Sequence, residues 1–200
     1  MTVRKLSTAK QVSIVAISAA LYAVFFFLSY VIALPNFTLL YLPIILLGVF
    51  PLWFGLSGLV GSMIGAFIGG VFVENLGYLA WIEVITALII YCLNWVLIPR
   101  KATDGKTKMG LFLLLSVYAF TLFVGLSYIL WQFTTPIAGL MNADTALVFF
   151  LPTFALNYAI AAITCPALIR AISPKLRSWG IYSGTFSDWR SKRKANHGKS

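Results

Sequence analysis

The sequence contains few acidic residues, histidines and cysteines. Of its 200 residues only five are Asp or Glu, one is His and two are Cys. The single histidine, His197, lies near the C-terminus, and neither Cys92 nor Cys165 has a partner at metal-ligand spacing. The chain also lacks the GxxxxGK[ST], HExxH and GxSxG motifs. We therefore expect no metal site, no disulfide, no cofactor, no enzymatic activity and no self-powered pumping.

Charge of either sign is scarce, whereas apolar residues are abundant. Charged residues make up 10% of the chain and hydrophobic residues 60%, compared with about 25% charged residues in soluble domains. The charge-free runs 11–73, 109–143 and 145–169 are long enough for membrane helices, which need about 20 apolar residues. Continuous apolar stretches such as ALYAVFFFLSYVIAL lack the alternation of a β-barrel. The sequence predicts an all-α integral membrane protein that crosses the cell membrane several times.

The basic residues fall into three segments, 4–10, 100–108 and 170–199. The positive-inside rule places all three in the cytoplasm, so an even number of crossings separates each neighbouring pair. Breaks are expected where proline, asparagine and glycine cluster, at 34–36, 50–53 and 75–77. We predict six transmembrane helices with cytoplasmic N and C termini in a membrane domain of residues 1–174, followed by a basic cytoplasmic tail, 175–200. The approximate helices are 11–34, 37–50, 54–73, 80–98, 109–133 and 146–169.

Small residues recur at helical spacing in two of these helices. Gly61, Gly65 and Gly69 are four residues apart, a spacing that lets membrane helices approach closely. We expect these glycines to pack against neighbouring helices. The first helix carries the sequence AISAALYA, which places alanines on two adjoining stripes: Ala16 and Ala20, and Ala19 and Ala23.

Three of the five acids lie on the predicted outer side, opposite the cations: Glu74, Glu83 and Asp144. An ionised carboxylate is costly to bury, and in membrane helices such residues usually face a cavity, a partner or a ligand. Glu74 is next to a turn, where a solvated position in the headgroup layer is an equal alternative. Glu83 is close to Trp81 and precedes an apolar helix, which favours a pocket.

Aromatic and polar residues at similar depth complete a candidate site. Tyr128, Trp131 and Gln132 lie near the outer end of the fifth predicted helix, where an interfacial aromatic belt is the alternative explanation. Aromatic faces combined with a carboxylate are suited to an amine or another cation. Asn157 lies midway along the sixth predicted helix and is expected either to bond another helix or to form the floor of a pocket.

From about residue 4 to residue 174 the chain resembles the substrate-binding S components of energy-coupling factor (ECF) micronutrient importers. The resemblance rests on the basic start with AISAALYA, on the LPNF turn, and on LPIILLGVFPLWFGLSGLVGSMIGAFIGG leading to the outer acidic turn. NYAIAAITCPALIRAISP is similar to the family's last helix. The tail after Pro174 lies outside the shared pattern.

The resemblance implies six helices and high-affinity capture of a vitamin or similar small molecule. The partners would be a transmembrane T component and two cytoplasmic ATPases, and the S component would topple in the membrane to release substrate inward. The family's A-x-x-x-A contact with the T component maps onto Ala16 and Ala20, with Ala19 and Ala23 as the overlapping alternative. The pocket would open outward, and its candidate residues are Asn36, Trp81, Glu83, Tyr128, Trp131, Gln132, Asp144 and Asn157, together with Glu74.

A different class of function remains open from the residues alone. A membrane assembly or scaffold protein would use the glycine and alanine strips only to bind partner helices. The basic tail either lies on the anionic inner leaflet or is solvated. Nucleic acid is not an expected partner, because the basic run is short and no nucleic-acid-binding fold accompanies it. The lipid bilayer is an expected partner under either hypothesis.

Overall fold

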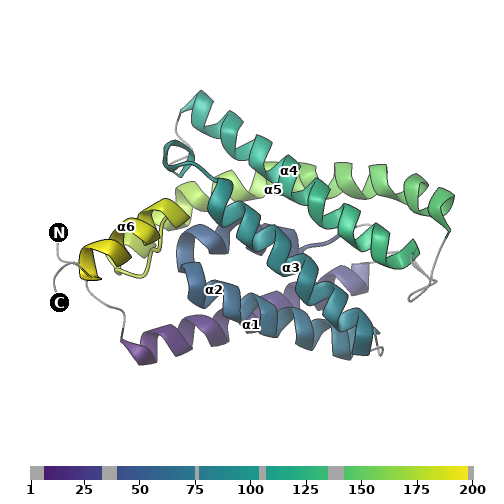
Figure 1. Ribbon diagram of the computed structural model, residues 1–200, viewed down its shortest axis with the longest axis horizontal. Helices are drawn as coiled ribbons and strands as arrows, with labels where there is room; N and C mark the ends of the chain where they lie inside the picture. The colour runs from purple at the N-terminus through teal and green to yellow at the C-terminus, as the bar shows by residue number, and fades with distance from the viewer. Residues whose placement is uncertain (1–6, 33–39, 75–76, 104–106, 135–141, 198–200) are drawn as a thin grey trace.

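A computed structural model describes residues 7–32, 40–74, 77–103, 107–134 and 142–197, although the side chains of 73–79 and 192–197 lie outside that description. Within these residues the protein is all-α, as predicted, and five helices are long and apolar enough to span a membrane. Figure 1 shows the elements, which are α1 (Thr8–Ile32), α2 (Pro43–Glu74), α3 (Gly77–Leu97), the short 3-10 helix η1 (Arg100–Ala102), α4 (Lys108–Thr134), α5 (Ala143–Ser178) and α6 (Phe186–His197).

The basic segments gather at one end of the bundle. In Figure 1 the N-terminal end of α1, η1 and α6 lie towards the left, whereas the C-terminal ends of α2 and α4 lie towards the right. The described parts of all three basic segments are therefore at the same end, as the charge pattern predicts. We call this the inner end and the opposite one the outer end.

Helix α2 contains two of the predicted helices. Its backbone is non-helical at Gly55 (φ 52°, ψ −128°), which divides it into a first arm, 43–54, and a second arm, 56–74. The first arm is about 18 Å long at 1.5 Å per residue, shorter than the roughly 30 Å of a bilayer core. Residues 43–53 are all buried. The predicted second helix is thus a buried core helix surrounded by the others.

The sequence predicted a break at 50–53, whereas the non-helical residue is Gly55. The difference arises because α2 tolerates both of its prolines, Pro43 and Pro51. Pro43 is the first residue of the helix, where its missing N–H would have no partner anyway. Pro51 removes the donor for the carbonyl of Leu47, and the Asn94 side-chain amide donates to that carbonyl instead, at 3.1 Å. Asn94 therefore bonds another helix, and the chain stays helical across the predicted break.

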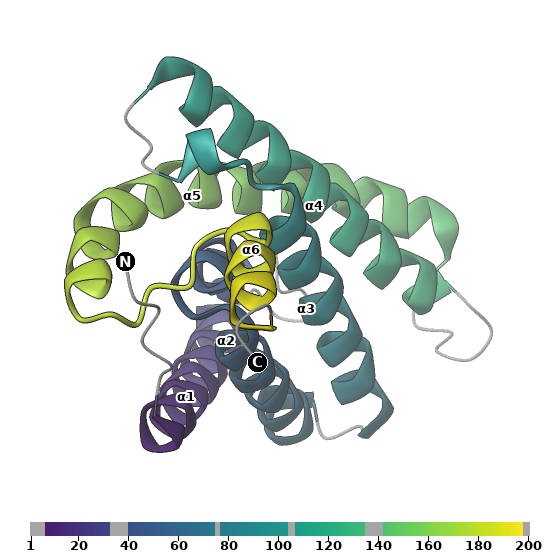
Figure 2. The ribbon, with the colours of Figure 1, turned by 60° about the vertical axis from the view of Figure 1, so that its left-hand side comes forward.

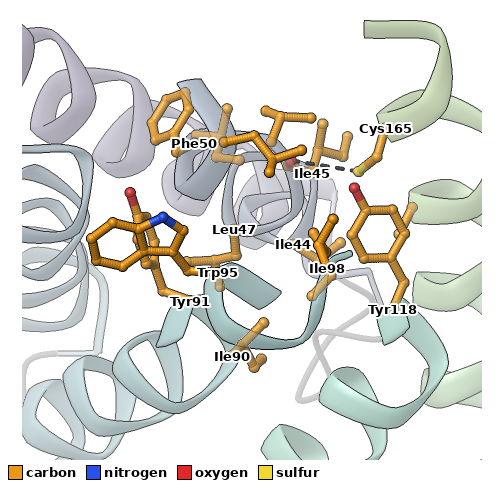
Figure 3. Close-up of a cluster of buried hydrophobic side chains, with 14 of the residues drawn as sticks. Ile44, Ile45, Leu47, Phe50, Ile90, Tyr91, Trp95, Ile98, Tyr118 and Cys165 are labelled. Atoms are coloured by element: carbon orange, nitrogen blue, oxygen red, sulfur yellow. Dashed lines mark hydrogen bonds between the residues drawn. The ribbon is translucent and has the colours of Figure 1, made fainter. Parts of the chain in front are cut away.

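The core surrounds the first arm. Figure 3 shows Tyr118 of α4 and Cys165 of α5 reaching it from one side, with Tyr91 and Trp95 of α3 on the other. The Tyr118 hydroxyl donates to the Gly48 carbonyl at 3.0 Å. These contacts fix the first arm relative to three surrounding helices.

Helix α1 packs on the second arm of α2 along the three glycines that are four residues apart. A Cβ at Gly61 would lie 2.5 Å from the Val15 carbonyl oxygen, and one at Gly69 would lie 2.8 Å from the Phe26 ring. Both separations are shorter than van der Waals contact, so only glycine allows this approach. Gly61, Gly65 and Gly69 all lie against α1, and we call them the glycine stripe.

The last membrane helix is longer than predicted. Helix α5 continues past residue 169 and through Pro174 to Ser178, so the predicted boundary between membrane domain and tail falls inside a helix. The chain then turns at Gly180 and Gly184, both at positive φ, before α6 begins. Figure 2 shows α6 lying across the inner end of the bundle.

Candidate functional site

The most deeply buried acidic group among the described side chains is Glu83, in the second turn of α3, which is 7% exposed. The Tyr22 hydroxyl of α1 donates to its Oε1 at 2.9 Å. The hydroxyl of Tyr41, just before α2, donates to the same oxygen, and the two phenol oxygens also contact each other. Three segments that are distant in sequence therefore meet at one carboxylate.

Tyr41 is held in place by its backbone. Its N–H donates to the Asn157 Oδ1 of α5 at 2.7 Å, and the N–H of Leu42 donates to the Ser29 Oγ of α1 at 2.8 Å. The Asn157 side-chain amide donates to the Thr153 carbonyl at 2.8 Å. The start of α2 is thus joined to α1 and α5, and Asn157 both bonds another element and supports the group around Glu83. We call Tyr22, Tyr41, Glu83 and Asn157 the Glu83 cluster.

The glycine stripe determines where Tyr22 lies. Tyr22 is fully buried, on the same stripe of α1 as Ser18 and Phe26. A Cβ at Gly65 would come within 2.7 Å of the Tyr22 Cβ, so a larger residue at 65 would displace the tyrosine from Glu83. The packing of α1 on α2 and the geometry of the cluster are therefore linked.

The cluster combines groups suited to binding a cation that carries hydrogens. A carboxylate accepts hydrogen bonds from an ammonium group, and such charge-assisted bonds are stronger than neutral ones. Phenol oxygens can accept from the same group, and the rings attract cations through their faces. The Tyr41 ring is also edge-on to Phe26, at 6.2 Å between centroids, which gives the group an apolar wall.

The predicted tryptophans lie elsewhere. Trp81 is 59% exposed and packs against Phe67, and Trp131 is 61% exposed and packs against Tyr128. The Gln132 side-chain amide donates to the Tyr128 hydroxyl at 3.1 Å, within α4. The two exposed tryptophan rings thus differ from the buried Tyr22 of the Glu83 cluster. The exposed rings match the interfacial aromatic alternative.

Of the remaining predicted residues, Asp144 lies at the outer end. Asp144 is exposed in the first turn of α5, where a negative charge favours the helix dipole. Asn142 caps that helix by accepting from the Thr145 N–H at 2.8 Å. Asn36 and the Glu74 side chain lie outside the described residues, so their predicted roles stay predictions.

Sequence reasoning missed two members of the cluster, Tyr22 and Tyr41. Tyr22 shares a stripe with Ser18 and Ser29 on an otherwise apolar helix, and this polar stripe is a usable signal. Tyr41 is one of several aromatic residues near the predicted outer ends of the helices, where an interfacial belt explains them without a ligand. Its proximity to Glu83 depends on how the short first arm is oriented, which no local pattern encodes.

The two alanine stripes of α1 have different environments. Ala19 is 8% exposed and lies against the glycine stripe, whereas Ala16 and Ala20 are exposed. Ala23 is half-buried. Of the two predicted alternatives, Ala16 and Ala20 therefore form the stripe that is accessible from outside the bundle.

Comparisons of the chain with protein-family models, with curated proteins and with solved structures found no match.

Proposed function

We propose that this protein is the substrate-binding subunit of an ECF-type importer, which captures a small amine-bearing or aromatic micronutrient from outside. The observation that carries the proposal is the Glu83 cluster. It places a buried carboxylate with two phenol donors away from the basic inner end of a membrane bundle.

The energetics of that carboxylate support a binding role. Burying a carboxylate costs free energy even when hydrogen bonds compensate part of the loss. A helix that only needed packing at position 83 would be more stable with an apolar residue there. A buried ionisable residue in a membrane helix is therefore a functional candidate by default, and a ligand ammonium group is the natural partner for a carboxylate beside two aromatic rings.

The exposed side of α1, which faces away from the bundle, supports the second part of the proposal, a transmembrane partner. Ala16 and Ala20 are exposed and follow the small-xxx-small pattern that allows close helix contact. The glycine stripe of α2 is already covered by α1, so it is not the partner surface. In this proposal the T component would lie on the Ala16 and Ala20 stripe, and ATP hydrolysis would belong to the two ATPase subunits.

Mass spectrometry of what the protein retains through gentle purification tests the proposal. We expect a bound amine-bearing or aromatic small molecule and, from the native membrane, a transmembrane partner with two ATPases. A stable complex that lacks both the ATPases and a small molecule would favour the membrane scaffold instead.

Replacing Ala16 and Ala20 together by tryptophan is expected to abolish association with the transmembrane partner and uptake, while ligand binding stays intact. Both positions are exposed, so the added rings cover the stripe without disturbing the core. The matched control is Ala19→Trp, which places the same ring in the α1–α2 seam and should prevent folding. Co-purification and ligand binding are measured for each variant. Normal association of the Ala16 and Ala20 double variant would exclude this stripe as the contact.

A further inference from the structure

A second set of contacts closes the inner end of the bundle, where residues 181–191 fold back onto it. We call these residues the C-terminal clasp. The Ser183 N–H donates to the Trp53 carbonyl and the Gly184 N–H to the Leu52 carbonyl, both at 2.9 Å. In an uninterrupted helix these carbonyls would accept from amides four residues further on, but the non-helical Gly55 lies between them and those amides. The clasp thus caps the end of the first arm.

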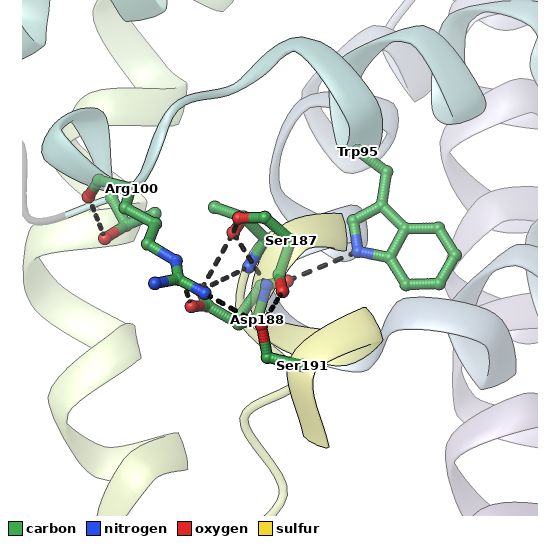
Figure 4. A network of polar contacts seen from close by, with 8 residues as sticks. Trp95, Arg100, Ser187, Asp188 and Ser191 are labelled. Atoms are coloured by element: carbon green, nitrogen blue, oxygen red, sulfur yellow. Dashed lines mark hydrogen bonds and ion pairs between the residues drawn. The ribbon is translucent and has the colours of Figure 1, made fainter. Parts of the chain in front are cut away.

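The clasp has its own fixed structure. Thr185 and Asp188 form a capping box at the start of α6, with the Thr185 hydroxyl donating to Asp188 Oδ2 at 2.8 Å and the Thr185 N–H donating to the same oxygen at 3.1 Å. The other carboxylate oxygen of Asp188 pairs with Arg100 of η1. Figure 4 shows this network.

Aromatic contacts attach the clasp to α3. The Trp95 ring nitrogen donates to the Gly184 carbonyl at 3.3 Å. The same ring packs against Phe186 and Trp189, with centroids 5.4 and 5.6 Å away. The clasp is therefore part of the folded bundle and not only a solvated tail.

The first arm of α2 connects the clasp with the Glu83 cluster. At its outer end Tyr41 and Leu42 bond Glu83, Asn157 and Ser29, and at its inner end the clasp caps its carbonyls. The arm between them is buried along its length. A short rigid helix held at both ends transmits a displacement from one end to the other, because it cannot deform within a close-packed core.

We propose that the C-terminal clasp and the Glu83 cluster are coupled through the first arm, so that release of the clasp loosens Tyr41 from Glu83 and the reverse also holds. Such coupling is reciprocal by thermodynamic necessity. If the coupling regulates ligand capture, that part of the inference rests on the proposed function. The test below needs no ligand, so a failure of the coupling is distinguishable from a failure of the proposed function.

Hydrogen–deuterium exchange of the purified full-length protein in nanodiscs tests the coupling in both directions. Tyr41→Phe removes the phenol donor at the outer end. If this loosens the cap that the 183 and 184 amides form at the inner end, exchange of these two amides should speed up by roughly fivefold, the factor that corresponds to the free energy of one helix cap. Asp188→Ala removes the capping box and the ion pair, whereas Asp188→Asn removes the ion pair and keeps an oxygen that can accept from the Thr185 N–H. Asp188→Ala is expected to speed exchange of the 41 and 42 amides by a similar factor, and Asp188→Asn by a smaller one.

Two matched controls accompany these variants. Tyr128→Phe removes a phenol hydroxyl on α4 outside the cluster, and Arg190→Gln changes an exposed residue of α6. Both should leave exchange at the opposite end unchanged. If each test variant speeds exchange only at its own end, the coupling is refuted. Equally faster exchange throughout α4 would assign the effect to global unfolding and would also overturn it.

Discussion

Replacing Gly65 by leucine is expected to destabilise the protein by about 3 kcal/mol or more, the upper range for overpacking a core, and to leave little folded material. A Cβ at this position would lie 2.5 Å from the Ala19 carbonyl oxygen and 2.7 Å from the Tyr22 Cβ. Neither atom can move without moving the α1 backbone. The melting temperature of the solubilised protein and its elution on size exclusion measure the effect.

The control for Gly65→Leu adds the same side chain where there is space for it. Ala20→Leu extends an exposed position of α1 and should leave the melting temperature nearly unchanged. Gly65→Ala should fall between the two variants, since it adds only the Cβ. An unaltered melting temperature in Gly65→Leu would mean that α1 does not pack on α2 along this stripe.

Replacing Glu83 by glutamine is expected to weaken ligand binding by roughly 10-fold to 100-fold, the loss of about 1.5–3 kcal/mol for a hydrogen bond to a charged group. Glutamine keeps the size of the side chain and an oxygen that can accept from Tyr22 and Tyr41. It removes the negative charge that an ammonium group would need. Calorimetric titration with the ligand found by mass spectrometry gives the Kd.

The same substitution should not weaken folding, because it removes the cost of burying a carboxylate. This separates a binding residue from a structural one. Asp144→Asn makes the same chemical change at an exposed site on α5. Its Kd should match that of the unaltered protein, and its melting temperature should fall by only a few degrees, since only a surface interaction with the helix dipole is lost. A lower melting temperature in Glu83→Gln with an unchanged Kd would assign Glu83 to structure alone.

Much of the fold could be predicted because its determinants are local. Apolar runs set the long helices, basic segments identified the inner end, and four-residue glycine spacing marked the α1–α2 seam. The break in α2 could not be placed, because the effect of Pro51 depends on whether another helix supplies a donor to Leu47, as Asn94 does. The clasp was missed for a similar reason, since its partners are backbone carbonyls exposed by the kink at Gly55.

The candidate site was predicted in part. Glu83 and Asn157 stood out because polar groups are costly in membrane helices, and this argument needs no tertiary information. The tryptophans did not join them, because nearness in sequence or in predicted depth does not determine which face of a helix a residue occupies. Trp81 is two residues from Glu83, and this spacing places the two on different faces of α3.

The central claim is that the Glu83 carboxylate holds a ligand, and the most direct test compares the small molecules retained by three forms of the protein. The unaltered protein, Glu83→Gln and Asp144→Asn are expressed and purified in parallel, and the released compounds are measured by mass spectrometry. We predict that the unaltered protein and Asp144→Asn each retain about one molecule of an amine-bearing or aromatic compound per protein molecule. Glu83→Gln should lose this compound. Equal retention by all three forms, or no retained compound in the unaltered protein, would contradict the claim.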